Sequence, residues 1–350
     1  MNDEYFLQRC INLALKAEGN TSPNPMVGSV IVLQNKIIGE GYHTEAGKPH
    51  AEVNAINSVK DKSLLSEATI YVSLEPCSHF GKTPPCSDLI IHHKFKRVVV
   101  GSLDSNPLVA GRGIKKLQDA GIETKIGVLE NECKKLNKRF FHFHTKKLPY
   151  VILKWAQTLD GFIDQRRNQN EKALQITNSK ASNLVHQYRA IEDSILIGKN
   201  TLLKDNPSLN VRLVSGKNPI PIILGWSKDI SITPKLFECH SKIYVFEEDE
   251  IEFSHAALNQ IKINPKNLEK VLKFLAEKGI QSILVEGGTK VLESFYQKGL
   301  WQELKVFESD IEINKGVKGP NIDFKNNSIT TQIESDLLFS KLNEIINNED

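Results

Sequence analysis

The sequence predicts a protein of two α/β domains. Its 350 residues exceed the usual size of one domain, which is roughly 100–200 residues. Segments with the spacing of amphipathic helices alternate with short apolar runs typical of buried strands, which indicates helices layered on sheets. The alternation closes before Lys146-Lys147-Leu148-Pro149 and restarts after it. We therefore expect one domain over residues 1–146 and a second over residues 147–350.

The first half contains a regular series of expected elements. Apolar side chains at helical spacing predict a helix over residues 4–18, which the Thr21-Ser22-Pro23-Asn24-Pro25 segment ends. Further helices are expected at residues 50–60, 87–93, 114–120 and 129–144. Strands are expected at residues 27–33, 36–41, 68–74, 97–101 and 122–128.

The second half repeats the alternation without repeating the sequence. Strands are expected at residues 150–156, 193–198, 220–224, 243–246 and 280–285. Helices are expected at residues 179–189 and 268–278, and from Glu286-Gly287-Gly288 to Gln297. The stretch after Asn326 is polar with scattered apolar residues, and its pattern predicts no particular element.

Composition narrows the classes of function. The 45 basic and 42 acidic residues nearly balance, so charge gives no reason to expect a nucleic-acid partner. A run of about 18 apolar residues is absent and the chain begins with Met1-Asn2-Asp3-Glu4, so we expect no membrane segment, no secretory signal and a cytoplasmic location. Five cysteines, an odd number, do not look like a disulfide framework.

Four residues of the first half form the strongest functional pattern. His50 lies two residues before Glu52, and Cys77 and Cys86 follow with eight residues between them. One His and two Cys can fill three positions of a tetrahedral zinc ion and leave the fourth for water, as catalytic sites do. Zinc lowers the pKa of such a water toward about 7. Glu52 can then move protons, and this combination is that of the zinc nucleobase deaminases.

A structural zinc site is the alternative interpretation of the same residues. It would need a fourth protein ligand, and His79 or His43 could supply one. The His50-Ala51-Glu52 triplet and the cysteine pair are each weak signals alone. Their joint occurrence favours the catalytic interpretation.

Several stretches resemble the bifunctional riboflavin-biosynthesis family, which joins a diaminohydroxyphosphoribosylaminopyrimidine deaminase to a 5-amino-6-(5-phosphoribosylamino)uracil reductase. In the first half these are residues 76–86 (PCSHFGKTPPC), Asn24-Pro25, residues 104–107 (DSNP) and residues 111–113 (GRG). In the second half they include Leu159-Asp160-Gly161, residues 201–207 (TLLKDNP) and Glu286-Gly287-Gly288. The resemblance covers about residues 1–300, and its deaminase motifs are the more specific part.

The resemblance implies a cytidine-deaminase-like three-layer domain followed by a dihydrofolate-reductase-like α/β domain. It implies zinc-dependent hydrolytic deamination of 2,5-diamino-6-(5-phosphoribosylamino)pyrimidin-4(3H)-one, then NADPH-dependent reduction of the ribosyl to the ribityl side chain. The expected cofactors are one Zn²⁺ per chain and NADPH. The expected partner is this small pyrimidine ribosyl phosphate, with no nucleic acid and no membrane, and a homodimer or higher homo-oligomer is a family expectation.

The resemblance also assigns roles to single residues. Besides Glu52 as the catalytic residue, deaminase substrate contacts map onto Asn24, His43, His79, Lys82, Thr83, Asp104 and Asn106. Reductase substrate contacts map onto Lys154, Arg189, Leu209, Arg212 and Glu286. Cofactor contacts map onto Gln157, Gln175, Thr201, Asp205, Gly287, Gly288 and Thr289.

The evidence for a cofactor site from the residues themselves is thinner. Glu286-Gly287-Gly288-Thr289 follows an apolar strand and opens a helix, which suits a phosphate-binding turn, although an ordinary strand-to-helix turn has the same pattern. The chain departs from the family at Gln175, where Trp is frequent, at Ala173, where Ser is frequent, and at Gly225, where Asp is frequent.

Three other functions stay open from the sequence. One is deamination of another base, such as guanine, cytidine or the wobble adenosine of tRNA. Another is a zinc-stabilised binding protein that senses a nucleotide without turnover. The last is an active deaminase whose reductase half has lost activity, which the departures at Ala173 and Gln175 suggest.

Overall fold

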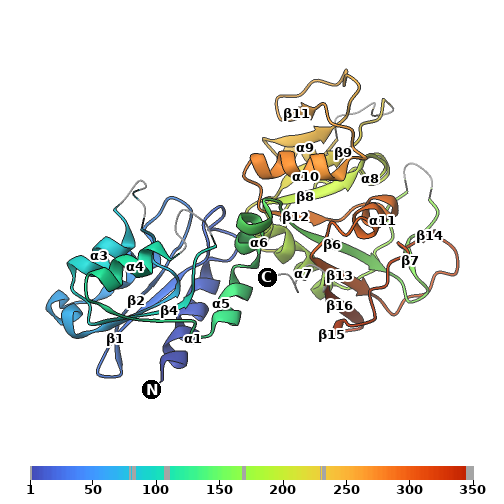
Figure 1. Cartoon of the computed structure of the whole chain (residues 1–350). Coiled ribbons are helices and arrows are strands. Elements are labelled where there is room, and N and C mark those ends of the chain that lie inside the picture. The colour runs from blue at the N-terminus through green and yellow to red at the C-terminus, as the bar shows by residue number, and fades with distance from the viewer. Residues whose placement is uncertain are drawn as a thin grey trace. The chain divides into compact units, whose positions relative to one another are not determined.

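A computed structural model describes residues 2–78, 80, 84–105, 111–167, 171–228, 230 and 234–343. The chain divides into two units, Met1–Lys147 and Leu148–Asp350, whose elements are drawn in Figure 1. Among the helices of the described residues, none is both long and apolar enough to cross a membrane.

The first unit contains a five-stranded sheet in the order β2-β1-β3-β4-β5. β1 pairs antiparallel with β2 and β3, whereas β3, β4 and β5 run parallel. The strands are β1 (Gly28–Leu33), β2 (Lys36–Tyr42), β3 (Thr69–Leu74), β4 (Arg97–Ser102) and β5 (Glu123–Ile126). The helices are α1 (Asp3–Ala14), η1 (Leu15–Ala17), α2 (Ala51–Ser58), η2 (Lys62–Glu67), α3 (Cys86–His92), α4 (Arg112–Asp119), α5 (Glu130–Leu136) and α6 (Lys138–Lys146).

The central strands are buried on both faces, which makes this unit three layers deep. Successive strand residues point to opposite faces. Val30 and Val99 pack with α1 and α5, whereas their neighbours Ile31 and Val98 pack with α2, α3 and α4. The predicted three-layer arrangement is therefore confirmed.

One expected helix is corrected. Residues 129–144 contain two helices, α5 and α6, which meet at Asn137. The Asn137 side-chain nitrogen donates to the Met26 carbonyl (2.9 Å), and its oxygen accepts the Met26 N–H (2.8 Å). Buried backbone groups need partners, and supplying them from Asn137 turns its backbone out of the helical conformation, to φ −111° and ψ 28°.

Asp3 ties the start of α1 to the sheet. Its carboxylate accepts two hydrogen bonds from Arg97 (2.9 and 3.1 Å), one from Lys125 (2.7 Å) and one from the Tyr71 hydroxyl (3.0 Å). Arg97 above all holds the pKa of Asp3 well below its ordinary value. A carboxylate with a lowered folded-state pKa stabilises the fold above the unfolded pKa of about 3.9, and this contribution is lost as the pH falls further.

We expect Asp3→Asn to loosen α1 at neutral pH. Hydrogen bonds to a charged group contribute about 1.5–3 kcal/mol, so amides of α1 should exchange about tenfold faster at pH 7. Hydrogen exchange read by mass spectrometry measures this in the full chain, with the second unit as internal reference. The difference in α1 exchange rate between Asp3→Asn and wild type should persist between pH 7 and 5 and become smaller below about pH 4. Asp119→Asn at the exposed end of α4 is the control, and a difference that vanishes near pH 6 would contradict the assignment to Asp3.

The second unit contains a nine-stranded sheet in the order β11-β10-β9-β8-β12-β6-β13-β16-β15. The strands from β11 to β13 run parallel, and β16 and β15 add antiparallel pairs at one edge. The strands of this sheet are β6 (Tyr150–Gln157), β8 (Ser194–Gly198), β9 (Ile220–Leu224), β10 (Ile243–Phe246), β11 (Leu258–Ile261), β12 (Ser282–Val285), β13 (Glu303–Glu308), β15 (Ile329–Ile333) and β16 (Asp336–Leu342). β7 (Phe162–Asp164) and β14 (Val317–Lys318) pair antiparallel in a separate two-stranded sheet. The helices are α7 (Ser179–Ile191), α8 (Lys199–Asp205), α9 (Leu236–Cys239), α10 (Leu268–Glu277) and α11 (Thr289–Gln297).

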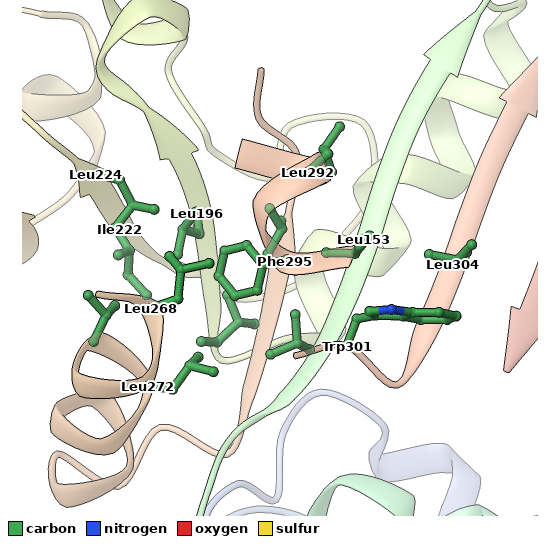
Figure 2. Close-up of a cluster of buried hydrophobic side chains, with 14 of the residues drawn as sticks. Leu153, Leu196, Ile222, Leu224, Leu268, Leu272, Leu292, Phe295, Trp301 and Leu304 are labelled. Carbon is green, nitrogen blue, oxygen red and sulfur yellow. The ribbon is translucent and has the colours of Figure 1, made fainter. Parts of the chain in front are cut away.

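Helices cover both faces of this second sheet. Figure 2 shows one apolar layer, in which Leu272 of α10 and Phe295 of α11 face strand residues such as Leu153 and Leu196. On the other face, α8 and α9 pack on the neighbours of these residues, including Ile195. The α/β arrangement predicted for the second half is confirmed, and β15 and β16 give structure to a stretch for which the sequence predicted no element.

Candidate active sites

Three metal-ligating side chains of the first unit converge at the ends of secondary structure elements. His50 is the N-cap residue of α2, Cys77 lies three residues after β3, and Cys86 is the first residue of α3. The His50 Nδ1 atom lies 3.6 Å from the Cys77 Sγ and 3.4 Å from the Cys86 Sγ. Their ligand atoms all lie within 4.8 Å of one another.

The donor set fits a zinc ion. The neighbouring Cys86 thiol lowers the pKa of Cys77, and His50 adds to this effect. The Cys86 backbone N–H at the start of α3 also donates to the Cys77 Sγ (3.3 Å), so a negative charge on this sulfur is stabilised. One imidazole nitrogen and two cysteine sulfurs are ligands that Zn²⁺ prefers.

Glu52 is buried beside this cluster. It lies in the first turn of α2 with 3% of its surface exposed. Burial raises the pKa of Glu52 to about 7, and the neighbouring Cys77 adds to the effect. A carboxyl group with this pKa can both accept and release a proton at neutral pH.

Asn24 and His43 are brought next to the cluster. The rings of His43 and His50 lie 5.5 Å apart between centroids. Asn24 Nδ2 donates to His43 Nε2 (3.1 Å), which leaves His43 Nδ1 to donate to the Pro49 carbonyl (3.1 Å). Both ring nitrogens are thus engaged, which counts against His43 as a fourth zinc ligand. Burial lowers the pKa of His43, in keeping with a neutral ring.

The other predicted contacts of the deaminase substrate lie in two loops. Asp104 is half-buried two residues after β4, and its backbone N–H donates to Glu75 (3.3 Å). The remaining four lie outside the described residues, namely His79, Lys82, Thr83 and Asn106.

A charged cluster of the second unit joins most of the predicted reductase substrate residues. Arg189 of α7 donates from Nε (2.9 Å) and Nη2 (2.6 Å) to the two carboxylate oxygens of Glu286, which follows β12. Burial by itself would raise the pKa of Glu286, but Arg189 and the nearby Lys154 hold it at about 2. Burial lowers the pKa of Lys154, and Glu286 opposes that effect.

Two further residues of this cluster were missed from the sequence. Asn210 bridges the arginines: its carbonyl accepts from Arg189 (3.3 Å) and its side-chain oxygen from Arg212 (3.2 Å). His186 Nδ1 accepts the backbone N–H of Arg212 (3.2 Å), and burial lowers the pKa of His186 to about 4. His186 precedes Arg189 by three residues, so helical spacing could have found it; no comparable signal marks Asn210. Leu209, the remaining predicted contact of the reductase substrate, directly precedes Asn210; its side chain is buried and its φ is positive, at 50°.

The predicted cofactor residues fall into two groups. Thr201 and Gly288 are close, because a Cβ atom on Gly288 would lie 3.3 Å from the Thr201 hydroxyl. A Cβ on Gly287 would lie 2.7 Å from Ile197, so only glycine allows this approach of α11 to β8. A glycine turn at the N-terminus of a helix, such as this one before α11, suits the phosphate groups of NADPH. Thr289, the first residue of α11, donates its hydroxyl hydrogen to the Lys318 carbonyl (3.2 Å).

The other three predicted cofactor residues already have protein partners. Asp205 at the end of α8 pairs with Arg167. Gln157 is buried in β6 and donates to Glu308 (3.1 Å). Gln175 is exposed before α7 and donates to the Thr177 carbonyl (2.9 Å).

Comparisons with known proteins cover both units. The family models of the cytidine and deoxycytidylate deaminase zinc-binding region and of the RibD C-terminal domain match residues 1–102 and 149–309. Similar relatives include the riboflavin biosynthesis protein RibD of Aquifex aeolicus, 40% identical over 87% of this chain and 86% of that protein. The RibD of Bacillus amyloliquefaciens is 39% identical over 91% of this chain and 87% of its own length.

A solved structure is similar over nearly the whole chain. It is a diaminohydroxyphosphoribosylaminopyrimidine deaminase/5-amino-6-(5-phosphoribosylamino)uracil reductase from Thermotoga maritima. It is 38% identical, with a TM-score of 0.87 over 97% of each chain. A RibD structure from Acinetobacter baumannii is 33% identical with the same TM-score. These matches confirm the cytidine-deaminase-like fold of the first half and the reductase fold of the second.

Proposed function

The chain belongs to the RibD family of riboflavin biosynthesis proteins, and from this premise we propose which residues carry its two reactions. The first is zinc-dependent hydrolytic deamination of 2,5-diamino-6-(5-phosphoribosylamino)pyrimidin-4(3H)-one. The second is NADPH-dependent reduction of the ribosyl to the ribityl side chain. We assign deamination to residues 1–146 and reduction to residues 147–350. The convergence of His50, Cys77 and Cys86 beside a buried Glu52 carries the assignment of the deaminase.

In the deaminase, His50, Cys77 and Cys86 would hold zinc, which when bound supplies a Lewis acid that lowers the pKa of water. Glu52 accepts a proton from the attacking water, because its raised pKa makes it a base of suitable strength near neutral pH. It then delivers protons to the ring nitrogen and to the departing amine. The carbon–nitrogen bond breaks, a carbonyl forms and ammonia leaves. Asn24 and the neutral His43 supply polar contacts to the base.

In the reductase, NADPH when bound would supply a hydride for C1 of the ribosylamino group; the bond from C1 to the ring oxygen breaks and that oxygen takes up a proton, which opens the sugar to a ribityl chain. The protein's part is to bind and orient the two molecules. Lys154, Arg189 and Arg212 outweigh the single negative charge of Glu286, so the cluster attracts the substrate phosphate. Thr201 and the Gly287-Gly288 turn bind the cofactor, and Gln157, Gln175, Asp205 and Thr289 complete the proposed set.

The decisive experiment incubates the purified full chain with the diaminopyrimidinone ribosyl phosphate and identifies the products by mass spectrometry. With zinc alone, we expect only the deaminated uracil derivative; with zinc and NADPH, its ribityl derivative. A chelator should stop deamination but not reduction of added intermediate. Deamination without reduction would contradict the reductase function of the second unit. The departures from the family at Ala173 and Gln175 would then be the first explanation to test. Absence of both reactions in zinc-loaded protein would reject the proposal. Light scattering of the same sample tests the proposed homo-oligomer.

A further inference from the structure

Glu75 is a buried carboxylate that neither proposed reaction uses. It directly follows β3 and precedes Cys77 by two residues, and 4% of its surface is exposed. Four backbone N–H groups converge on its two oxygens. Oε2 accepts from Asp104 (3.3 Å) and Gly111 (2.9 Å), and Oε1 accepts from Gly113 (2.9 Å) and Ile114 (3.3 Å).

Two of these bonds cap a helix that cannot cap itself. The N-cap residue of α4 is Gly111, which has no side chain to accept the free N–H groups of the first turn, and this turn contains no acidic residue. Glu75 supplies the missing acceptor and the negative charge from the end of β3. A carboxylate at a helix N-terminus is also favoured by the helix dipole.

The same contacts hold Asp104, shortly after β4, and Gly111, at the start of α4, against the end of β3, three residues before the zinc ligand Cys77. The Glu75 backbone N–H donates to the Ser102 carbonyl (2.9 Å), which joins the ends of β3 and β4. A Cβ atom on Gly113 would lie 2.2 Å from the Pro76 carbonyl, so α4 starts in direct contact with the residue before Cys77. Asp104, which the family resemblance assigns to substrate binding, lies two residues after β4 and donates its backbone N–H to Glu75.

We infer that Glu75 is a positioning residue of the deaminase, which sets substrate affinity by fixing Asp104 and the start of α4 relative to the end of β3. The inference rests on the proposed function of the first unit. A carboxylate is required because it offers acceptors on both oxygens. In glutamine one oxygen becomes an NH₂ group, which would face two N–H donors and repel them.

The test is Glu75→Gln in the zinc-loaded full chain, with kcat and KM of deamination measured separately. Loss of hydrogen bonds to a buried charge predicts a KM raised about tenfold or more, with kcat changed less. Bound zinc, measured by atomic absorption, should stay at the wild-type level, and reduction of added intermediate should be unchanged. Glu75→Asp, which keeps both acceptors on a shorter side chain, should recover part of the affinity. Glu67→Gln, an exposed change in the same unit, should match wild type.

The other possible outcomes contradict either the role inferred for Glu75 or the deaminase function proposed for this chain. Unchanged KM in Glu75→Gln would overturn the inference. Loss of zinc in Glu75→Gln would also overturn the inference, because Glu75 would then act by positioning the zinc ligand Cys77 rather than Asp104. If Glu75→Gln does not fold, Glu75→Asp decides alone, and a wild-type KM in that variant contradicts the inference. Failure of the wild-type chain to deaminate contradicts the proposed function itself.

Discussion

Glu52→Gln should abolish deamination while zinc binding and the reductase reaction persist. The amide has nearly the same shape as the carboxyl group, so the buried first turn of α2 should keep its packing. It cannot take up or deliver a proton. General acid–base catalysis contributes about 10²–10⁴-fold to a rate, and Glu52 serves both proton transfers, so we expect a loss of about 10³-fold or more in kcat.

The measurements for Glu52→Gln are deamination by mass spectrometry, zinc per chain by atomic absorption, and NADPH oxidation with added intermediate. The exposed Glu67→Gln change provides a matched control for the substitution itself. Activity that survives in Glu52→Gln would remove Glu52 as the proton shuttle. Loss of zinc along with activity would instead give Glu52 a role in holding the cluster of His50, Cys77 and Cys86.

Arg189→Met should abolish reduction and destabilise the second unit. The change leaves the Glu286 carboxylate buried without the two hydrogen bonds that Arg189 donates to it. Breaking a buried ion pair at one partner costs about 3–5 kcal/mol. The cluster also loses a cation that the proposal assigns to the substrate. We expect NADPH oxidation to fall at least about 100-fold, while deamination of the starting substrate continues.

Two further variants separate binding from stability. Arg189→Met combined with Glu286→Gln should recover part of the thermal stability, because the Glu286 carboxylate is no longer left buried without Arg189, but should recover no reduction. Lys180→Met removes an exposed cation from the same helix and should behave like wild type. Reduction at the wild-type rate in Arg189→Met would exclude Arg189 from the reductase site.

The zinc cluster and the order of elements could be predicted from the sequence because their signals are local. His50 and Cys86 stand at helix starts and Cys77 follows an apolar strand, so each ligand is marked by its neighbours along the chain. The strands around them are buried on both faces and appear as uninterrupted apolar runs. The strand predicted at residues 220–224 has the bounds observed for β9.

The C-terminal edge strands and the break at Asn137 depended on distant partners. β15 is largely exposed and β16 alternates only partly, so neither has the apolar pattern that marks a central strand. They form because β16 pairs with the edge that β13 offers, and β15 in turn pairs with β16. The break between α5 and α6 reflects hydrogen bonds to Met26, which lies 111 residues earlier in the sequence.

By itself, the sequence determined the fold class, the zinc donor set and the neighbouring Glu52, because short-range spacing of distinctive residue types encodes them. Only the tertiary structure decided which ordinary polar residues surround these sites. Glu75, His186 and Asn210 have common side chains. Glu75 and His186 accept from backbone N–H groups, and Asn210 accepts from Arg189 through its own backbone carbonyl; in each case a long chain segment separates the partners. A backbone N–H or carbonyl is the same in every residue, so the sequence contains no mark of such a contact before the chain folds.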